Sequence, residues 1–148
     1  MSPGETERRQ AILLHIVLTA SIAVYAALLG VLAAGGLRLP PRSPTGSPGS
    51  FWALAAIGLA QFAGVWWLGW RRLGRGTAGN QAPARVRTFF LVRAAAAEAL
   101  GVFGLLAGIL EAPPAETIAL FVLSLAAMFA GAPTRPAWDA AMRRAEGR

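Results

Sequence analysis

The chain has 148 residues, of which 55% are hydrophobic and 14% are charged, and its formal net charge is +7. A soluble domain carries roughly 25% charged residues, so this composition argues against an ordinary soluble fold. The sequence contains no cysteine, which excludes disulfides, thiolate metal ligands and a thiol nucleophile. Every positive charge is an arginine, and most of the arginines lie beside apolar runs, so anionic lipid headgroups are better partners than nucleic acid.

Four apolar runs follow one another along the chain, at about 11–34, 51–70, 89–110 and 116–132. A helix needs about 20 residues to cross about 30 Å of hydrocarbon, so the first three are long enough and the fourth spans only if it stands upright. All ten prolines lie outside the runs, as continuous helices require. The sequence therefore predicts a single domain, 1–148, that folds as an all-α bundle of four transmembrane helices. Its last part, 133–148, is expected to be a cytoplasmic tail.

The segments between the runs are polar or rich in proline and glycine: a Pro/Gly/Ser loop at 35–50, a basic loop at 71–87 and an acidic turn at 111–116. The first run also has features of a signal peptide, but its apolar part exceeds 20 residues where 7–15 is typical, so we expect a retained helix. In the tail, Trp138 and Met142 are four residues apart. They predict either a short amphipathic helix with these side chains facing lipid or a frayed end.

The arginines predict the orientation. Arg38 and Arg42 would lie on one side of the membrane, and the opposite side would receive a larger set that includes both chain ends. The positive-inside rule then places both termini in the cytoplasm, and the expected location is the bacterial inner (plasma) membrane, crossed several times. The larger set comprises Arg8, Arg9, Arg71, Arg72, Arg75, Arg85, Arg87, Arg135, Arg143, Arg144 and Arg148.

Glu98 is the most informative residue, because it lies near the middle of the third run. An ionised acid at that depth costs about 3 kcal/mol on insertion scales, so the carboxyl should be neutral, paired or next to water. One interpretation is a neutral acid whose hydrogen bonds fix helix packing; the other is a carrier of protons or ions. Arg93 lies closer to the cytoplasmic boundary and is expected to extend its side chain towards water.

Other polar residues lie near the midpoints of the remaining runs and predict one hydrogen-bonded layer with Glu98. The amide of Gln61 is the expected partner of the Glu98 carboxyl. The other members of this layer are Thr19, Ser21 and Ser124.

Small residues form a stripe on one face of the third run, at spacings of three and four. Such a face allows another helix to approach closely, and the second run carries a similar alanine stripe, 53–63. The simplest expectation is that the second run packs on the third, with formation of a homo-oligomer through the glycine face as the alternative. The stripe comprises Ala94, Ala97, Gly101, Gly104 and Gly108.

The sequence shows no nucleophile–base pair, phosphate-binding loop or carboxylate pair, and His15 has no further residues spaced as metal ligands. We therefore expect no enzyme activity, cofactor or metal. Two functional hypotheses follow: a structural or accessory membrane protein, such as a subunit of a larger membrane complex, or a protein that handles protons or ions through Glu98.

The segment from Arg93 through Glu98 to Leu110, with Phe121 and the exit 131–136, resembles a class of small, uncharacterised four-helix bacterial membrane proteins. This resemblance implies an integral membrane protein and no particular activity. The same helix is also faintly similar to the ion-carrying helix of rotor-ring c-type subunits, in which a mid-membrane acid lies among small residues. The first run departs from that family because it lacks a glycine repeat, with only Gly30 before its end.

Overall fold

The computed structural model describes residues 3–34, 49–74, 81–109 and 114–147. The regular structure in these ranges is helical: α1 (Pro3–Ala34), α2 (Gly49–Leu73), α3 (Ala82–Ile109), α4 (Pro114–Gly131) and α5 (Arg135–Ala145). The first four helices are long and apolar enough to cross a membrane, which confirms the four predicted runs. The predicted loop 71–87 is shorter than expected, because α2 continues to Leu73 and α3 begins at Ala82; residues 75–80 and most of the segments 35–50 and 111–116 lie outside the described residues or at helix ends.

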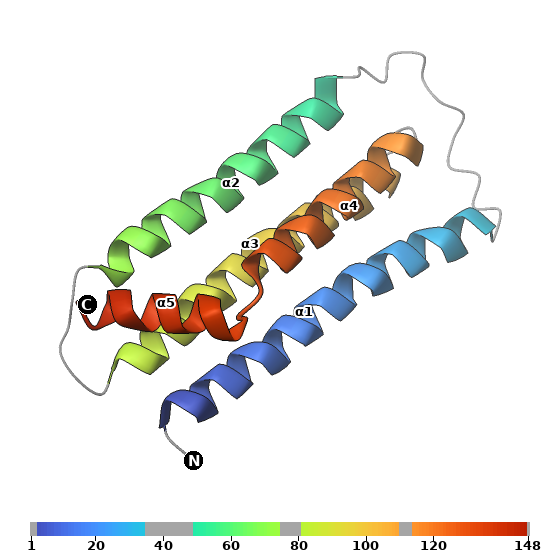
Figure 1. Cartoon of the computed structure of the whole chain (residues 1–148). Coiled ribbons are helices and arrows are strands. Elements are labelled where there is room, and N and C mark those ends of the chain that lie inside the picture. Colours follow the sequence, from blue (N-terminus) through green and yellow to red (C-terminus); the bar gives the residue numbers. More distant parts are fainter. Residues whose placement is uncertain (1–2, 35–48, 75–80, 110–113, 148) are drawn as a thin grey trace.

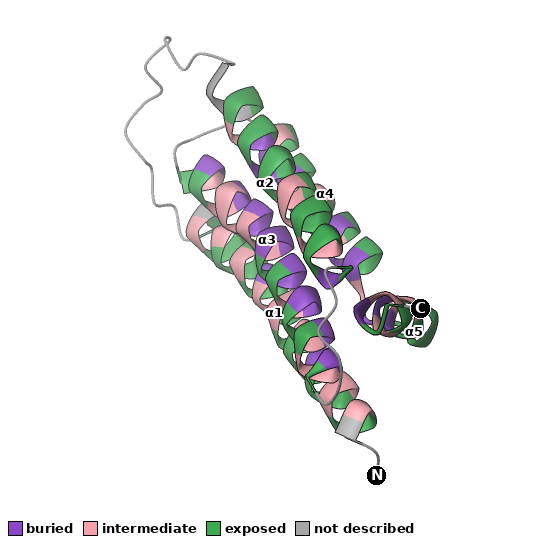
Figure 2. Cartoon of the chain, turned by 90° about the vertical axis from the view of Figure 1, so that its left-hand side faces the viewer, coloured by how far each residue is buried: buried purple, intermediate pink, exposed green. Residues whose placement is uncertain are grey.

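α3 is the central helix of the bundle. In the most apolar stretch of 18 residues of α3, half of the residues are buried, whereas the share is 11% in the corresponding stretches of α1 and α2. α1 and α2 lie on opposite sides of the α3–α4 pair (Figure 1), and each packs on α3. Buried positions run along α3, while α2 is largely exposed on its outward side (Figure 2). The alanine-rich stretch around Glu98 suits this role, because alanine is the best helix former and permits close neighbours.

The small-residue stripe of α3 lies against α4 and α1, and not against α2 as expected. A Cβ placed on Gly104 would lie 3.3 Å from Leu120 of α4, and one placed on Gly108 would lie 2.7 Å from Leu29 of α1. The physical reason is the short connection between α3 and α4, which makes these helices antiparallel neighbours and gives α4 the face that allows the closest approach.

α2 uses a different face from its alanine stripe. Ala53, Ala56, Ala60 and Ala63 are exposed. Contact with α3 is made through glycines, since a Cβ on Gly58 would lie 2.3 Å from Leu100 and one on Gly69 would lie 2.7 Å from Phe89. Glycine lets a large apolar partner approach the α2 backbone more closely than alanine would, which accounts for the rotation of α2 relative to the prediction.

α5 lies across one end of the bundle (Figures 1 and 2), where α1 begins, α2 ends and α3 begins; we call this the α5 end. The helix was one of the two predicted states of the tail, but its apolar side faces the protein and not lipid. Trp138 is only 4% exposed and stacks on Phe90, with ring centroids 5.7 Å apart and planes 13° apart. Leu73, Val86 and the partly buried Met142 complete this cluster.

Candidate functional site

Glu98 is bound to α1 by two hydroxyl groups. The Ser21 hydroxyl lies 2.5 Å from Oε1 of Glu98, and the Tyr25 hydroxyl lies 3.0 Å from the same oxygen. Ser21 and Tyr25 are four residues apart, so both face α3 from successive turns of α1. All three side chains are partly buried, and together they form the carboxyl–hydroxyl cluster between α1 and α3.

The predicted partner of Glu98 was Gln61, and the structure places that amide elsewhere. Gln61 is exposed on α2, outside the face that carries Gly58 and Gly69. α2 is rotated so that those glycines face α3 and Gln61 is exposed. The contacts of Glu98 come from α1 instead.

The remaining residues of the predicted polar layer make backbone contacts. Ser124 of α4 is fully buried and donates to the carbonyl of Ala97, with 2.7 Å between the oxygens. Thr19 donates to the carbonyl of His15 within its own helix, at 2.8 Å. α3 is therefore held by side-chain hydrogen bonds on two sides, from α1 through Glu98 and from α4 through Ser124. These bonds form two separate groups and not one continuous layer.

Arg93 is buried, with 5% of its surface exposed, and does not extend into water as expected. Its guanidinium carbon lies 3.4 Å from the ring centroid of Trp66, and its Nη2 donates to the carbonyl of Ala130 at 3.1 Å. Ala130 is in the last turn of α4, whose final carbonyls have no partner within the helix and carry partial negative charge. Arg93 thus satisfies a helix end and links α2, α3 and α4.

Two further contacts join the helices at the α5 end. Arg87 of α3 forms a salt bridge with Glu7 of α1 at 2.8 Å and donates to Gln10 at 2.6 Å. Arg144 of α5 donates to the carbonyl of Trp70, in the last turn of α2, at 3.0 Å. Both arginines therefore serve contacts within the protein, in addition to setting the charge of this end.

Metal binding has no support in the described part of the chain, where no group of three or more His, Asp or Glu side chains could hold an ion. The imidazole of His15 is partly buried, and its Nδ1 has no hydrogen-bond partner among the described residues. A single imidazole without neighbouring ligands is not a metal site.

Sequence reasoning did not assign a role to Tyr25 or to the contacts of Arg93. The spacing of Ser21 and Tyr25 was a usable signal, because residues four apart share a helix face. For Arg93 the signal was depth: Trp66 lies seven residues before the end of α2, and Ala130 one residue before the end of α4. All three residues are thus close to the same end of the bundle.

A scan of family models and searches of curated proteins and solved structures found no match to this chain. The carboxyl–hydroxyl cluster can do two things chemically: hold two helices together through hydrogen bonds, or bind and release one proton between hydroxyl groups.

Proposed function

We propose that this chain is a small integral membrane protein of structural or accessory type, without enzyme activity, in which Glu98 stabilises the packing of α1 on α3. The observation that carries the proposal is the pair of hydroxyl contacts from Ser21 and Tyr25 to one carboxyl oxygen. In a bilayer, helices gain little from apolar contact alone, because lipid tails are as apolar as leucine, so interhelical hydrogen bonds and close packing decide which helices associate.

The outer surface supports placement in a membrane. Large apolar side chains are exposed on all four long helices, including Val17 of α1 at 62%, Trp52 of α2 at 67% and Phe129 of α4 at 73%. In water such a surface would promote aggregation, whereas in lipid it is matched by the acyl chains. A bundle with an apolar exterior and polar contacts inside suits a protein that crosses the membrane four times.

The arrangement of the ends supports the proposed orientation. The first turns of α1, the end of α2, the start of α3 and α5 all lie at the α5 end, as the Glu7–Arg87 and Arg144–Trp70 contacts require. Most arginines belong to these segments. The positive-inside rule then places the α5 end in the cytoplasm, in an inner (plasma) membrane, with anionic headgroups as its surroundings.

The size of the effect supports a packing role. Interhelical hydrogen bonds in a bilayer contribute about 0.6 kcal/mol each on average and up to about 1.7 kcal/mol. Two bonds therefore hold α1 on α3 by about 1–3 kcal/mol. These bonds add specific contacts to a helix of which only 11% of the most apolar 18-residue stretch is buried.

The hydroxyl geometry also favours a second candidate function, in which Glu98 handles a proton. Ser21 contacts both Oε1 of Glu98 and the carbonyl of Leu18, at 2.5 and 2.7 Å, but one hydroxyl hydrogen serves one acceptor at a time. A protonated Glu98 would donate to Ser21 and leave the Ser21 hydrogen for Leu18. An ionised Glu98 would instead accept the hydrogen bond from the Ser21 hydroxyl. Rotation of the Ser21 hydroxyl therefore accompanies any proton transfer at this site.

Two substitutions separate these functions. Glu98→Gln keeps a hydrogen-bonding group of the same shape but cannot titrate, whereas Glu98→Ala leaves Ser21 and Tyr25 without their acceptor. A packing role predicts that Glu98→Gln stays within about 1 kcal/mol of the unchanged protein in unfolding from detergent micelles and that Glu98→Ala loses about 1–3 kcal/mol. Proton uptake measured with the protein in liposomes supplies the second readout. If the unchanged protein takes up protons and the folded Glu98→Gln variant does not, the result would favour proton handling over a packing role.

A further inference from the structure

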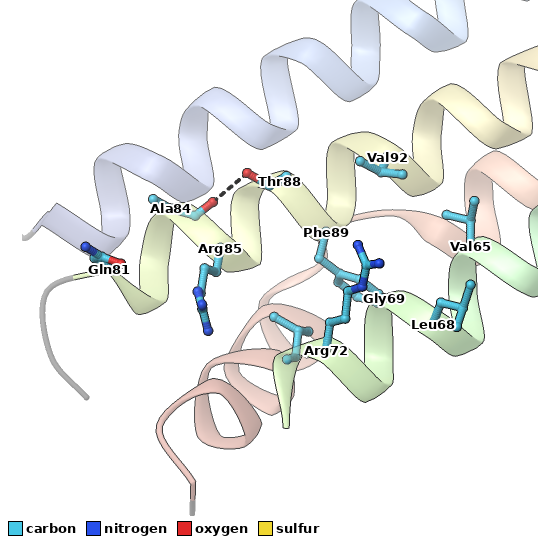
Figure 3. Close-up of a pocket in the computed structure, with 11 residues that line it drawn as sticks. Val65, Leu68, Gly69, Arg72, Gln81, Ala84, Arg85, Thr88, Phe89 and Val92 are labelled. Atoms are coloured by element: carbon cyan, nitrogen blue, oxygen red, sulfur yellow. Dashed lines mark hydrogen bonds between the residues drawn. The ribbon is translucent and has the colours of Figure 1, made fainter. Parts of the chain in front are cut away.

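An open groove of about 680 Å³ lies between α2 and α3 at the α5 end (Figure 3). Its volume falls in the range of about 300–1,000 Å³ that ligand sites in proteins occupy. Phe89 is buried beneath it and packs closely on Gly69 of α2. From α2 the groove is lined by Leu68, Gly69 and Arg72, and from α3 by Arg85, Phe89 and Val92.

The groove changes in polarity along its length. Arg85 lies at the outer end, the Arg72 side chain extends over the groove beside Phe89, and Val65, Leu68 and Val92 lie further along the helices (Figure 3). Arg85 and Val92 are seven residues apart on α3, which corresponds to about 10 Å along the helix. The groove therefore offers two cations and then an apolar channel, in the order in which a phospholipid presents its phosphate and its acyl chain.

The two cations of the groove have no partners in the part of the chain that the structure describes: Arg72 and Arg85 form no salt bridge there. No acidic side chain lines the groove. Other arginines of the same end are used differently, since Arg87 is bound to Glu7 and Arg144 to the carbonyl of Trp70. Arg72 and Arg85 are both exposed, so their charges are available to an anion from outside the bundle.

We propose that this groove binds one phospholipid with an anionic headgroup, with the phosphate between Arg72 and Arg85 and an acyl chain along Leu68 and Val92. The proposal rests on the membrane placement and orientation given above, which bring the groove to the level of the cytoplasmic headgroups. Charge selects this occupant: a helix from a second copy of the chain would cover the apolar part but leave the two guanidinium groups without counter-charge.

Native mass spectrometry of the protein extracted from membranes in mild detergent tests the proposal, with phosphatidylglycerol and phosphatidylcholine as competing probes. The unchanged protein should retain one phosphatidylglycerol in preference to phosphatidylcholine. Either Arg72→Gln or Arg85→Gln alone should reduce that preference by about fivefold, and the two substitutions together should reduce it by about 30-fold. The matched control is Arg9→Gln with Arg143→Gln, which removes the same charge from exposed positions outside the groove and should leave the preference unchanged.

A bulkier side chain that fills the groove provides a second test, and it does not alter the charge of the protein. Val92→Trp should expel the retained lipid, whereas Val24→Trp, at an exposed valine of α1, should not. Equal lipid retention in groove and control variants would overturn the proposal, as would a lipid-free dimer whose contact maps to Val92. Absence of the protein from the membrane fraction would instead refute the proposed function, so the two failures are distinguishable.

Discussion

The buried guanidinium of Arg93 should be coupled energetically to Trp66, and a double-mutant cycle measures that coupling directly. The guanidinium carbon is 3.4 Å from the ring centroid, well inside the limit of about 6 Å for a cation–π contact. Because Arg93 is only 5% exposed, water competes weakly for the cation. We therefore expect about 2 kcal/mol, the value for desolvated pairs.

The cycle compares Arg93→Met, Trp66→Leu and the double variant by their free energies of unfolding in mixed detergent micelles. The single substitution at Arg93 is not diagnostic by itself. It removes a charge-assisted hydrogen bond to Ala130 worth about 1.5–3 kcal/mol but also removes the cost of burying a charge. The coupling term cancels both contributions and isolates the contact with the ring.

Arg71 and Trp67 provide a matched control in the same helix. Their separation is 4.2 Å, but both residues are exposed at the end of α2, so the coupling there should be about 0.5–1 kcal/mol. The reasoning would be refuted by a coupling between Arg93 and Trp66 at or below about 0.5 kcal/mol, the level at which independent substitutions simply add. A coupling no larger than that of the control pair would also refute it.

Three further predictions concern packing, and the first two use the same unfolding assay. Gly69→Ala places a methyl group 2.7 Å from the Phe89 ring, whereas a methyl group at Gly64 meets nothing within 4 Å. The Gly69→Ala variant should therefore be less stable than the Gly64→Ala variant by about 1–3 kcal/mol. Equal stabilities would contradict the α2–α3 contact. Tyr25→Phe removes one of the two bonds to Glu98 and should cost about 0.6 kcal/mol, with no loss if the contact is unimportant. Trp138→Ala removes the ring that stacks on Phe90 and should detach α5 from the bundle. Trypsin should then cleave faster after Arg143 and Arg144. An unchanged rate of cleavage would show that α5 is held by other contacts.

The helices could be predicted from the sequence because length and apolar composition alone decide them. Proline positions set their limits, and the interior of each run contains good helix formers. The rotation of each helix about its axis was harder to predict. Ala53, Ala56, Ala60 and Ala63 gave a periodic stripe on α2, yet the contact with α3 uses glycines on another face. Small residues permit close packing on whichever face they occupy, so the pattern does not identify the partner.

The candidate site was predicted in part, for a related reason. Depth in the membrane placed Glu98, Ser21 and Ser124 at similar levels, and the structure brings Ser21 to the carboxyl. The choice between Ser21 and Gln61 depended on helix rotation, which depth does not determine. Arg93 was expected to reach water because it lies close to the predicted cytoplasmic boundary and has a long side chain. Its actual partners, a ring of α2 and a carbonyl of α4, come from two other helices and become visible only when the fold is known.

The central claim is that the chain crosses a membrane four times with the α5 end in the cytoplasm, and cysteine accessibility tests it most directly. The chain has no cysteine, so each introduced thiol is unique. Thr45→Cys, Thr77→Cys and Thr134→Cys place one thiol after α1, one after α2 and one after α4. The account predicts that a membrane-impermeant maleimide labels position 45 in intact cells and labels positions 77 and 134 only after the membrane is opened. Labelling of position 77 or 134 from outside, or recovery of the protein from the soluble fraction, would contradict it.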